Sequence, residues 1–364
     1  MKTRARTLFC FLLLVSVACS LYAQVDVPVS IPGTQLLKMR SSILDEDFSL
    51  LVQFPRFYED TSRTFPAVYL LDGQWDFPLV NGLTGGQYYD GFIPEAMVVG
   101  IAWTGEHPNY DSLRVKDLTP TRIQQLPHSG DAPKFLSFLK NEVIPLIESK
   151  YRASKEDRTL IGSSLGGLFT LYTLFHETAL FQRYILTSPA LNWDNGAIYA
   201  AESTYAANNT QLPVKLFMAI GGYEGVQEFE KFVARLKERH YKGLTFESRV
   251  LEGMGHSGSK PEGYTRGLQA VFARPSLNVD SQILDQYAGT YEPTPGMRVK
   301  LANENGKLVG YAPGTDKLTF EAQTETDFYL KGSYLFLHFK KDPTGKVTGF
   351  QLHSFNGGGF VKKE

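Results

Sequence analysis

The chain has 364 residues, of which 43% are hydrophobic, 13% aromatic and 21% charged. This profile is typical of a globular protein and excludes a disordered or fibrous chain. Binding to a nucleic-acid backbone requires clustered Lys and Arg. Here 37 basic side chains are balanced by 38 acidic ones, for a net charge of −1, and they form no basic block. Nucleic acid is therefore not an expected partner, and the length predicts about two domains.

The first 23 residues predict a signal peptide. Three basic side chains precede an apolar stretch at residues 8–18 that is too short to span a bilayer, and Ala23 is a small residue at a cleavage point. The alternative is a lipoprotein with its lipid on Cys19. The other cysteine, Cys10, also lies in this segment, so the mature protein is expected to have no disulfide and no thiolate metal site. We expect an exported protein, periplasmic or secreted, without a transmembrane segment.

Residues 24–274 are predicted to form an α/β domain. Short runs that are apolar on both faces alternate with longer stretches of helical spacing, a pattern that indicates a mostly parallel sheet covered by helices. The predicted strands are residues 66–71, 96–101, 159–161, 184–186, 214–220 and 246–251. The predicted helices are residues 134–151, 168–176 and 226–241. Pro145 must remove one backbone hydrogen bond from the first of these helices.

The pattern changes after Arg274-Pro275-Ser276. From residue 287 onward, short strand-like segments are separated by turn signals such as Asn305-Gly306 and Pro313-Gly314. The segments are residues 298–301, 308–311, 317–321, 327–330 and 334–339. We expect a linker at residues 275–283 and a small all-β domain at residues 284–364.

The segment Gly162-Ser163-Ser164-Leu165-Gly166 fits the pattern G-x-S-x-G. Three fixed residues are weak evidence alone, but the motif follows a predicted strand and opens a predicted helix. A strand–turn–helix setting is what a nucleophile elbow requires, and its glycines leave room on a strained turn. Ser164, centred between the glycines, is the predicted nucleophile. The alternative is a glycine-rich turn without chemistry.

A serine nucleophile needs a base, and the base needs an acid. His256 lies in a glycine-rich loop after the strand at 246–251, and the C-terminal end of a strand is where an α/β sheet places its chemistry. In hydrolases with a nucleophile elbow the acid lies between serine and histidine in the chain. Glu224 directly follows the strand at 214–220, whereas Glu228 could instead stabilise a helix N-terminus. On position we favour Glu224, with Glu228 as the alternative.

Acyl transfer also requires donors for the tetrahedral oxyanion. The backbone N–H of Leu165, directly after the nucleophile, is one candidate, and the N–H of Gln74, in the turn after the strand at 66–71, is the other. Four aromatic residues in loops could stack on a substrate ring or could equally be packing residues. They are Trp75, Trp103, Trp193 and Tyr223. No cofactor or metal is expected, because the sequence has no metal-ligand spacing and no dinucleotide-binding glycine motif.

Several motifs, taken in order, resemble one known family. They are Ser41-Ser42 and residues 51–55, 65–73, 114–120, 138–145, 160–169 and 187–190. Together they resemble the enterochelin-esterase-like (esterase D) group of α/β-hydrolases over about residues 35–274. The resemblance implies the α/β-hydrolase sandwich, a Ser164–His256–Glu224 triad, and Gln74 and Leu165 as oxyanion donors. The family commonly has histidine where this chain has Ser163. The tail from residue 284 resembles a small lipocalin-like, barrel-like β domain appended to bacterial periplasmic hydrolases.

These features predict an exported serine carboxylic-ester hydrolase that works through an acyl-enzyme. Its substrate would be a small-molecule or polysaccharide-linked ester, with siderophore esters, hydroxycinnamoyl esters and acetylated sugars all open. The alternatives are an acyltransferase that uses the same triad and a glycan-binding protein with a vestigial site.

Overall fold

The computed structural model describes residues 29–363, except residues 57, 60, 62, 293–297, 334 and 354–357. The predicted signal peptide, with both cysteines, lies outside this part of the chain. No helix within the described residues is long and apolar enough to cross a membrane.

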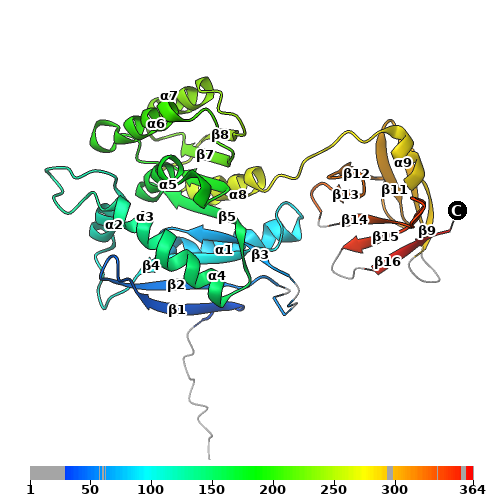
Figure 1. Cartoon of the computed structure of the whole chain (residues 1–364), viewed down its shortest axis with the longest axis horizontal. Helices are drawn as coiled ribbons and strands as arrows, with labels where there is room; N and C mark the ends of the chain where they lie inside the picture. The colour runs from blue at the N-terminus through cyan, green and yellow to red at the C-terminus, as the bar shows by residue number, and fades with distance from the viewer. Residues whose placement is uncertain are drawn as a thin grey trace, which may run out of the picture. The chain divides into compact units, whose positions relative to one another are not determined.

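The described chain first builds an eight-stranded sheet in the order β1-β2-β4-β3-β5-β6-β7-β8 (Figure 1). The strands are β1 (Thr34–Arg40), β2 (Asp47–Gln53), β3 (Phe65–Leu70), β4 (Met97–Trp103), β5 (Ala153–Ser163), β6 (Arg183–Thr187), β7 (Lys215–Gly221) and β8 (Thr245–Leu251). All neighbouring pairs from β4 to β8 are parallel. The predicted mostly parallel sheet is thus confirmed, and the structure adds the antiparallel strands β1 and β2 at one edge.

Helices cover both faces of this sheet. They are α1 (Gly73–Tyr89), α2 (Tyr110–Leu118), α3 (Ala132–Phe138), α4 (Ile144–Lys150), α5 (Leu165–His176), α6 (Ala197–Asn208), α7 (Val226–Glu238) and α8 (Ser259–Val271). On one face α5 packs against α2, α3 and α6, and on the other α1 packs against α8. Residues 184–186 of strand β6 are apolar throughout because helices cover the strand on both faces. Tyr184 and Leu186 join the core under α5, whereas Ile185 faces α8.

Helix α8 lies unusually close to the sheet. A Cβ added at Gly267 would lie 2.4 Å from Cγ2 of Ile185, and a Cβ added at Gly263 would lie 2.4 Å from Cγ2 of Thr187. Real Cβ atoms do not approach other heavy atoms so closely, so α8 keeps this position only because both residues are glycine.

The predicted helix at 134–151 is divided in two. One π-helical turn, Leu139–Val143, joins α3 to α4, and Pro145, which has no N–H to donate, follows directly after that turn. In that π turn, Glu142 accepts hydrogen bonds from Ser41 Oγ at 2.6 Å and from the backbone N–H of Ser42 at 2.9 Å. Two of the motif blocks noted in the sequence therefore bind each other.

Beyond the sheet, the described residues form a closed antiparallel barrel of eight strands (Figure 1). It follows α9 (Ser281–Tyr287) and comprises β9 (Gly289–Glu292), β10 (Val299–Glu304), β11 (Lys307–Tyr311), β12 (Leu318–Ala322), β13 (Asp327–Leu330), β14 (Phe336–Lys341), β15 (Val347–His353) and β16 (Gly358–Lys362). Aromatic side chains pack inside it; Tyr287 of α9 stacks on Phe339 with ring centroids 4.0 Å apart. The expectation of an all-β, barrel-like tail is confirmed.

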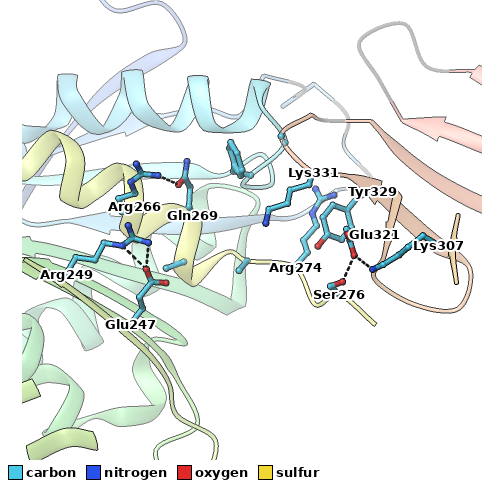
Figure 2. A pocket seen from close by; sticks show the side chains of 15 residues that line it. Glu247, Arg249, Arg266, Gln269, Arg274, Ser276, Lys307, Glu321, Tyr329 and Lys331 are labelled. Atoms are coloured by element: carbon cyan, nitrogen blue, oxygen red, sulfur yellow. Dashed lines mark hydrogen bonds and ion pairs between the residues drawn. The ribbon is translucent and has the colours of Figure 1, made fainter. Parts of the chain in front are cut away.

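The segment after α8 is bonded to the barrel (Figure 2). Ser276 Oγ donates to Glu321 at 2.5 Å, and Lys307 reaches the same carboxylate oxygen at 2.8 Å. The Leu277 N–H donates to the carbonyl of Ala322 at 2.8 Å. The first residues of the predicted linker are therefore fixed along β12.

Candidate active site

Ser164 occupies the sharp turn between β5 and α5. Its φ of 59° and ψ of −119° are uncommon for a residue with a side chain. The Ser164 N–H donates to the carbonyl of Thr187 at 3.0 Å, and its own carbonyl accepts from the N–H of Ala190 at 3.2 Å. A Cβ at Gly162 would lie 2.3 Å from the carbonyl oxygen of Gly166. The turn that presents Ser164 thus depends on a glycine two residues before it.

Replacing that glycine is expected to damage the fold. The methyl group of Gly162→Ala must displace the Gly166 carbonyl, which should lower the free energy of unfolding by about 2 kcal/mol or more. Chemical denaturation of the full chain measures this. Gly85→Ala is the matched control, because the added Cβ meets nothing within 4 Å in helix α1, where alanine is the better helix former. Equal stability of the two variants would contradict the expectation.

Glu224 and His256 form a hydrogen-bonded pair. His256 Nδ1–H donates to Glu224 Oε2 at 2.5 Å. The other carboxylate oxygen, Oε1, accepts from the Gly221 N–H at 2.9 Å and from Ser188 Oγ at 2.6 Å. A Cβ at Gly221 would lie 2.7 Å from Oε1, so glycine at the end of β7 makes room for the carboxylate. With Nδ1 bonded to Glu224, Nε2 is the ring nitrogen left to accept a serine proton.

Ser164, Glu224 and His256 line one cavity of about 260 Å³. No hydrogen bond joins Ser164 Oγ to His256, although the structure describes both residues; such bonds often tighten only when substrate is bound. Glu228 lines the same cavity, but its carboxylate pairs with Lys231 at 3.7 Å. The geometry therefore brings together the predicted nucleophile, base and preferred acid, and places the alternative acid nearby without contact to the base.

The two predicted oxyanion donors lie on neighbouring loops. Gln74 is in the first turn of α1 and Leu165 is in the first turn of α5, where backbone N–H groups have no acceptor within their own helix. The preceding strands, β3 and β5, are adjacent in the sheet. A Cβ at Gly166 would lie 3.2 Å from Oδ2 of Asp72, which shows that the two loops touch.

A buried ion pair supports the first of these loops. Arg114 donates from Nε and Nη2 to the two oxygens of Asp72, at 2.7 and 3.0 Å. Burial raises the pKa of Asp72, and the Arg114 charge opposes that rise. The guanidinium also lies 5.4 Å from the ring centroid of Trp75. Residues 65–73 and 114–120, two further motif blocks, are therefore joined beside the site.

Residues 41–216 match a family model described as "Putative esterase", and residues 273–359 match a domain of unknown function, DUF3471. The ferri-bacillibactin esterase BesA of Bacillus subtilis is 28% identical in an alignment of 268 residues that covers 66% of this chain and 90% of BesA. The siderophore triacetylfusarinine C esterase of Aspergillus fumigatus is 27% identical in an alignment of 216 residues that covers 54% of this chain and 70% of that enzyme. The chain is similar to the enterochelin-esterase-like group of α/β-hydrolases.

Solved structures resemble the same part of the chain. The BES protein from Bacillus cereus is 25% identical with a TM-score of 0.61, covering 68% of this chain and 97% of its own. An IroE-like serine hydrolase from Shewanella oneidensis is 26% identical with a TM-score of 0.59, covering 70% and 85%. Together with the relatives named as esterases, the esterase family model shows that the chain is an esterase.

None of the four aromatic candidates lines the cavity that Ser164, Glu224 and His256 share. Trp103 is buried, stacks on Phe135 and donates to Asp117 at 2.7 Å, so the packing alternative holds for it. Trp193 packs against the core and donates to Thr121. Trp75 and Tyr223 are 46% and 81% exposed. Spacing along the chain placed these rings near the site, but it could not show which way each side chain points.

Three residues that line the cavity were not among the site residues predicted from the sequence. Ser188, Pro189 and Ala190 line it, and they belong to a motif quoted only for its resemblance to the family. The available signal was their position directly after a predicted strand, where parallel sheets place functional loops. Across the described residues, no cluster of three or more His, Cys, Asp or Glu side chains could hold a metal ion.

Proposed function

We propose that this hydrolase cleaves carboxylic esters through a Ser164–His256–Glu224 triad. Ser164 Oγ attacks the ester carbonyl while His256 takes its proton, and the Leu165 and Gln74 N–H groups stabilise the oxyanion. Water activated by His256 then releases the acid from the acyl-enzyme. The observation that supports this most is the 2.5 Å bond from His256 to Glu224 at a cavity that also contains Ser164.

Among the substrates that remain open, we propose siderophore-type esters, because one relative is named a siderophore triacetylfusarinine C esterase and another a ferri-bacillibactin esterase. We also propose that the protein is exported, on the basis of the signal-peptide pattern in residues 1–23. An exported esterase of this kind would meet its ester outside the cytoplasm.

A substrate panel tests the proposed class. The purified full chain is expected to hydrolyse a siderophore triester with a higher kcat/KM than a hydroxycinnamoyl ester or an acetylated sugar. Mass spectrometry of the products identifies the bond cleaved, and an added acceptor alcohol reveals any acyl transfer. Preference for one of the other two esters would overturn the substrate class while leaving the esterase chemistry in place.

We further propose that residues 24–274 carry the activity without the barrel. A fragment ending at Arg274 is expected to fold and to hydrolyse a small chromogenic ester at a rate close to that of the full chain, because every proposed catalytic residue precedes its end. Circular dichroism and initial rates, measured beside the full chain, check both points. An insoluble or inactive fragment would mean that the barrel completes the core or the site.

A further inference from the structure

A pair of buried serines lies behind the carboxylate of Glu224. Ser188 follows β6 and Ser259 opens α8, and they are 3% and 0% exposed. Ser188 Oγ lies 2.6 Å from Glu224 Oε1 and 2.8 Å from Ser259 Oγ. Ser259 Oγ lies 2.8 Å from the carbonyl oxygen of His256. The two hydroxyls therefore connect the carboxylate of Glu224 to the backbone of its histidine partner.

Counting the hydroxyl hydrogens shows which serine donates to Glu224 in this series of hydrogen bonds. The three contacts share two hydroxyl hydrogens, because an ionised carboxylate and a carbonyl can only accept. A carboxylate oxygen 2.6 Å from a hydroxyl oxygen requires a hydrogen between them, so the Ser188 hydrogen belongs to Glu224, in a charge-assisted bond. The single hydrogen of Ser259 is then left for either Ser188 or the His256 carbonyl.

This donation determines how the carboxylate is turned. Oε1 accepts from both Ser188 Oγ and the Gly221 N–H, which leaves Oε2 to face Nδ1 of His256. If the Gly221 N–H were the only donor to Oε1, the carboxylate would be freer to rotate about its terminal torsion, which is a broad, soft degree of freedom. The second donor, Ser188, removes that freedom.

The backbone of Ser188 is also tied to the nucleophile. Ser188 has a φ of 46°, which is costly for a residue with a side chain. Its N–H donates to the Ala219 carbonyl at 2.7 Å, while Thr187 and Ala190 on either side bond the backbone of Ser164. One short segment therefore holds the backbone of the nucleophile and the carboxylate of the acid.

We propose that Ser188 is a positioning residue that orients Glu224 toward His256, an inference that rests on the triad proposed above. In that scheme its hydroxyl bonds Glu224 and not the reacting atoms, and it acts by limiting where the imidazole can lie. Its loss should lower kcat more than it changes KM, because the misdirected histidine affects the transition state rather than substrate binding.

The test replaces Ser188 by alanine and by glycine in the full chain. Both changes remove the hydroxyl, and each is expected to lower kcat by about 10- to 100-fold with KM nearly unchanged, the scale of a hydrogen bond to a charged group. Glycine also relieves the positive φ, so Ser188→Gly should be at least as thermostable as Ser188→Ala. Equal losses of kcat with different melting temperatures would separate positioning from stability. Ser129→Ala, at a buried serine bonded to the Leu126 carbonyl, is the control and should keep kcat.

A double-mutant cycle completes the experiment. With Glu224→Gln present, Ser188→Ala is expected to lower kcat by less than about 3-fold further, because residues that act as a unit are not additive. The inference is overturned if the Ser188 variants keep the kcat of the parent chain, or if their loss is undiminished beside Glu224→Gln. Near-normal activity of Glu224→Gln itself would overturn both the acid assignment and the role of Ser188. Activity in Ser164→Ala would instead refute the proposed function, so these failures are distinguishable.

Discussion

Ser164→Ala is expected to abolish ester hydrolysis while leaving the melting temperature nearly unchanged. The half-buried hydroxyl contributes little packing, and alanine tolerates the strained turn no worse than serine does. What remains should be the rate that binding and the oxyanion donors supply, a loss of about 10⁶-fold in kcat. Initial rates on a chromogenic ester and a thermal melt measure the two effects.

The neighbouring serine supplies a matched control. Ser163 is 1% exposed, and its hydroxyl has no hydrogen-bond partner among the described residues. Ser163→Ala therefore removes an unpaired buried hydroxyl and should preserve both activity and stability. A fluorophosphonate probe should label the parent chain and Ser163→Ala but not Ser164→Ala. Labelling or full activity of Ser164→Ala would refute the assignment of the nucleophile.

Glu224→Gln is expected to produce the second largest loss, about 10³- to 10⁴-fold in kcat, as when the acid of a serine triad is disabled. Glutamine keeps the shape of the side chain but removes the charge that stabilises the imidazolium. It also offers an amide that disturbs the His256 tautomer. Because the His256 Nδ1 bond goes to Glu224, the defect should appear in kcat and not in the fold. Single-turnover kinetics and circular dichroism separate the two.

Glu228→Gln is the paired control for that substitution. Glu228 lies in the first turn of α7 and lines the cavity, but its carboxylate pairs with Lys231. Its replacement should cost only a few tenths of a kcal/mol of helix stability and change kcat little. The reverse pattern would transfer the acid role to Glu228. Small losses in both variants would indicate that His256 works with Ser164 alone.

The features that could be predicted from the sequence are those formed by residues close to one another in the chain. The elbow could be predicted because strand, turn and helix are contiguous around Ser164, and His256 because its loop directly follows a strand. The sequence favoured Glu224 over Glu228 on position alone, since both follow β7 within one helical turn. That choice depends on which carboxylate reaches a histidine about 30 residues away, which is a tertiary contact. Strand β16 escaped prediction because it begins with glycines, which weaken the strand pattern.

The motif blocks likewise separate what the sequence can predict from what only the fold shows. Ser41-Ser42 and Glu142, like Asp72 and Arg114, belong to blocks that the sequence displays separately, and the fold joins them pairwise. The resemblance identified the blocks, but only the structure gives their pairing. Ser188 is the clearest case, because a lone serine after a strand has no sequence signature for the carboxylate it contacts.

The glycines of α8 affect the geometry of the proposed active site, because they allow this helix to lie close to the sheet. Gly263 allows the helix to rest on the side chain of Thr187, the residue whose carbonyl receives the Ser164 N–H and whose neighbour is Ser188. The same helix begins at Ser259, three residues after His256. The close approach of helix and sheet therefore contributes to the spacing between His256, the proposed base, and Ser164, the proposed nucleophile. A misplacement of about 1 Å can cost 10²-fold in rate. The geometry of the proposed triad therefore depends in part on Gly263, a residue that has no functional group of its own.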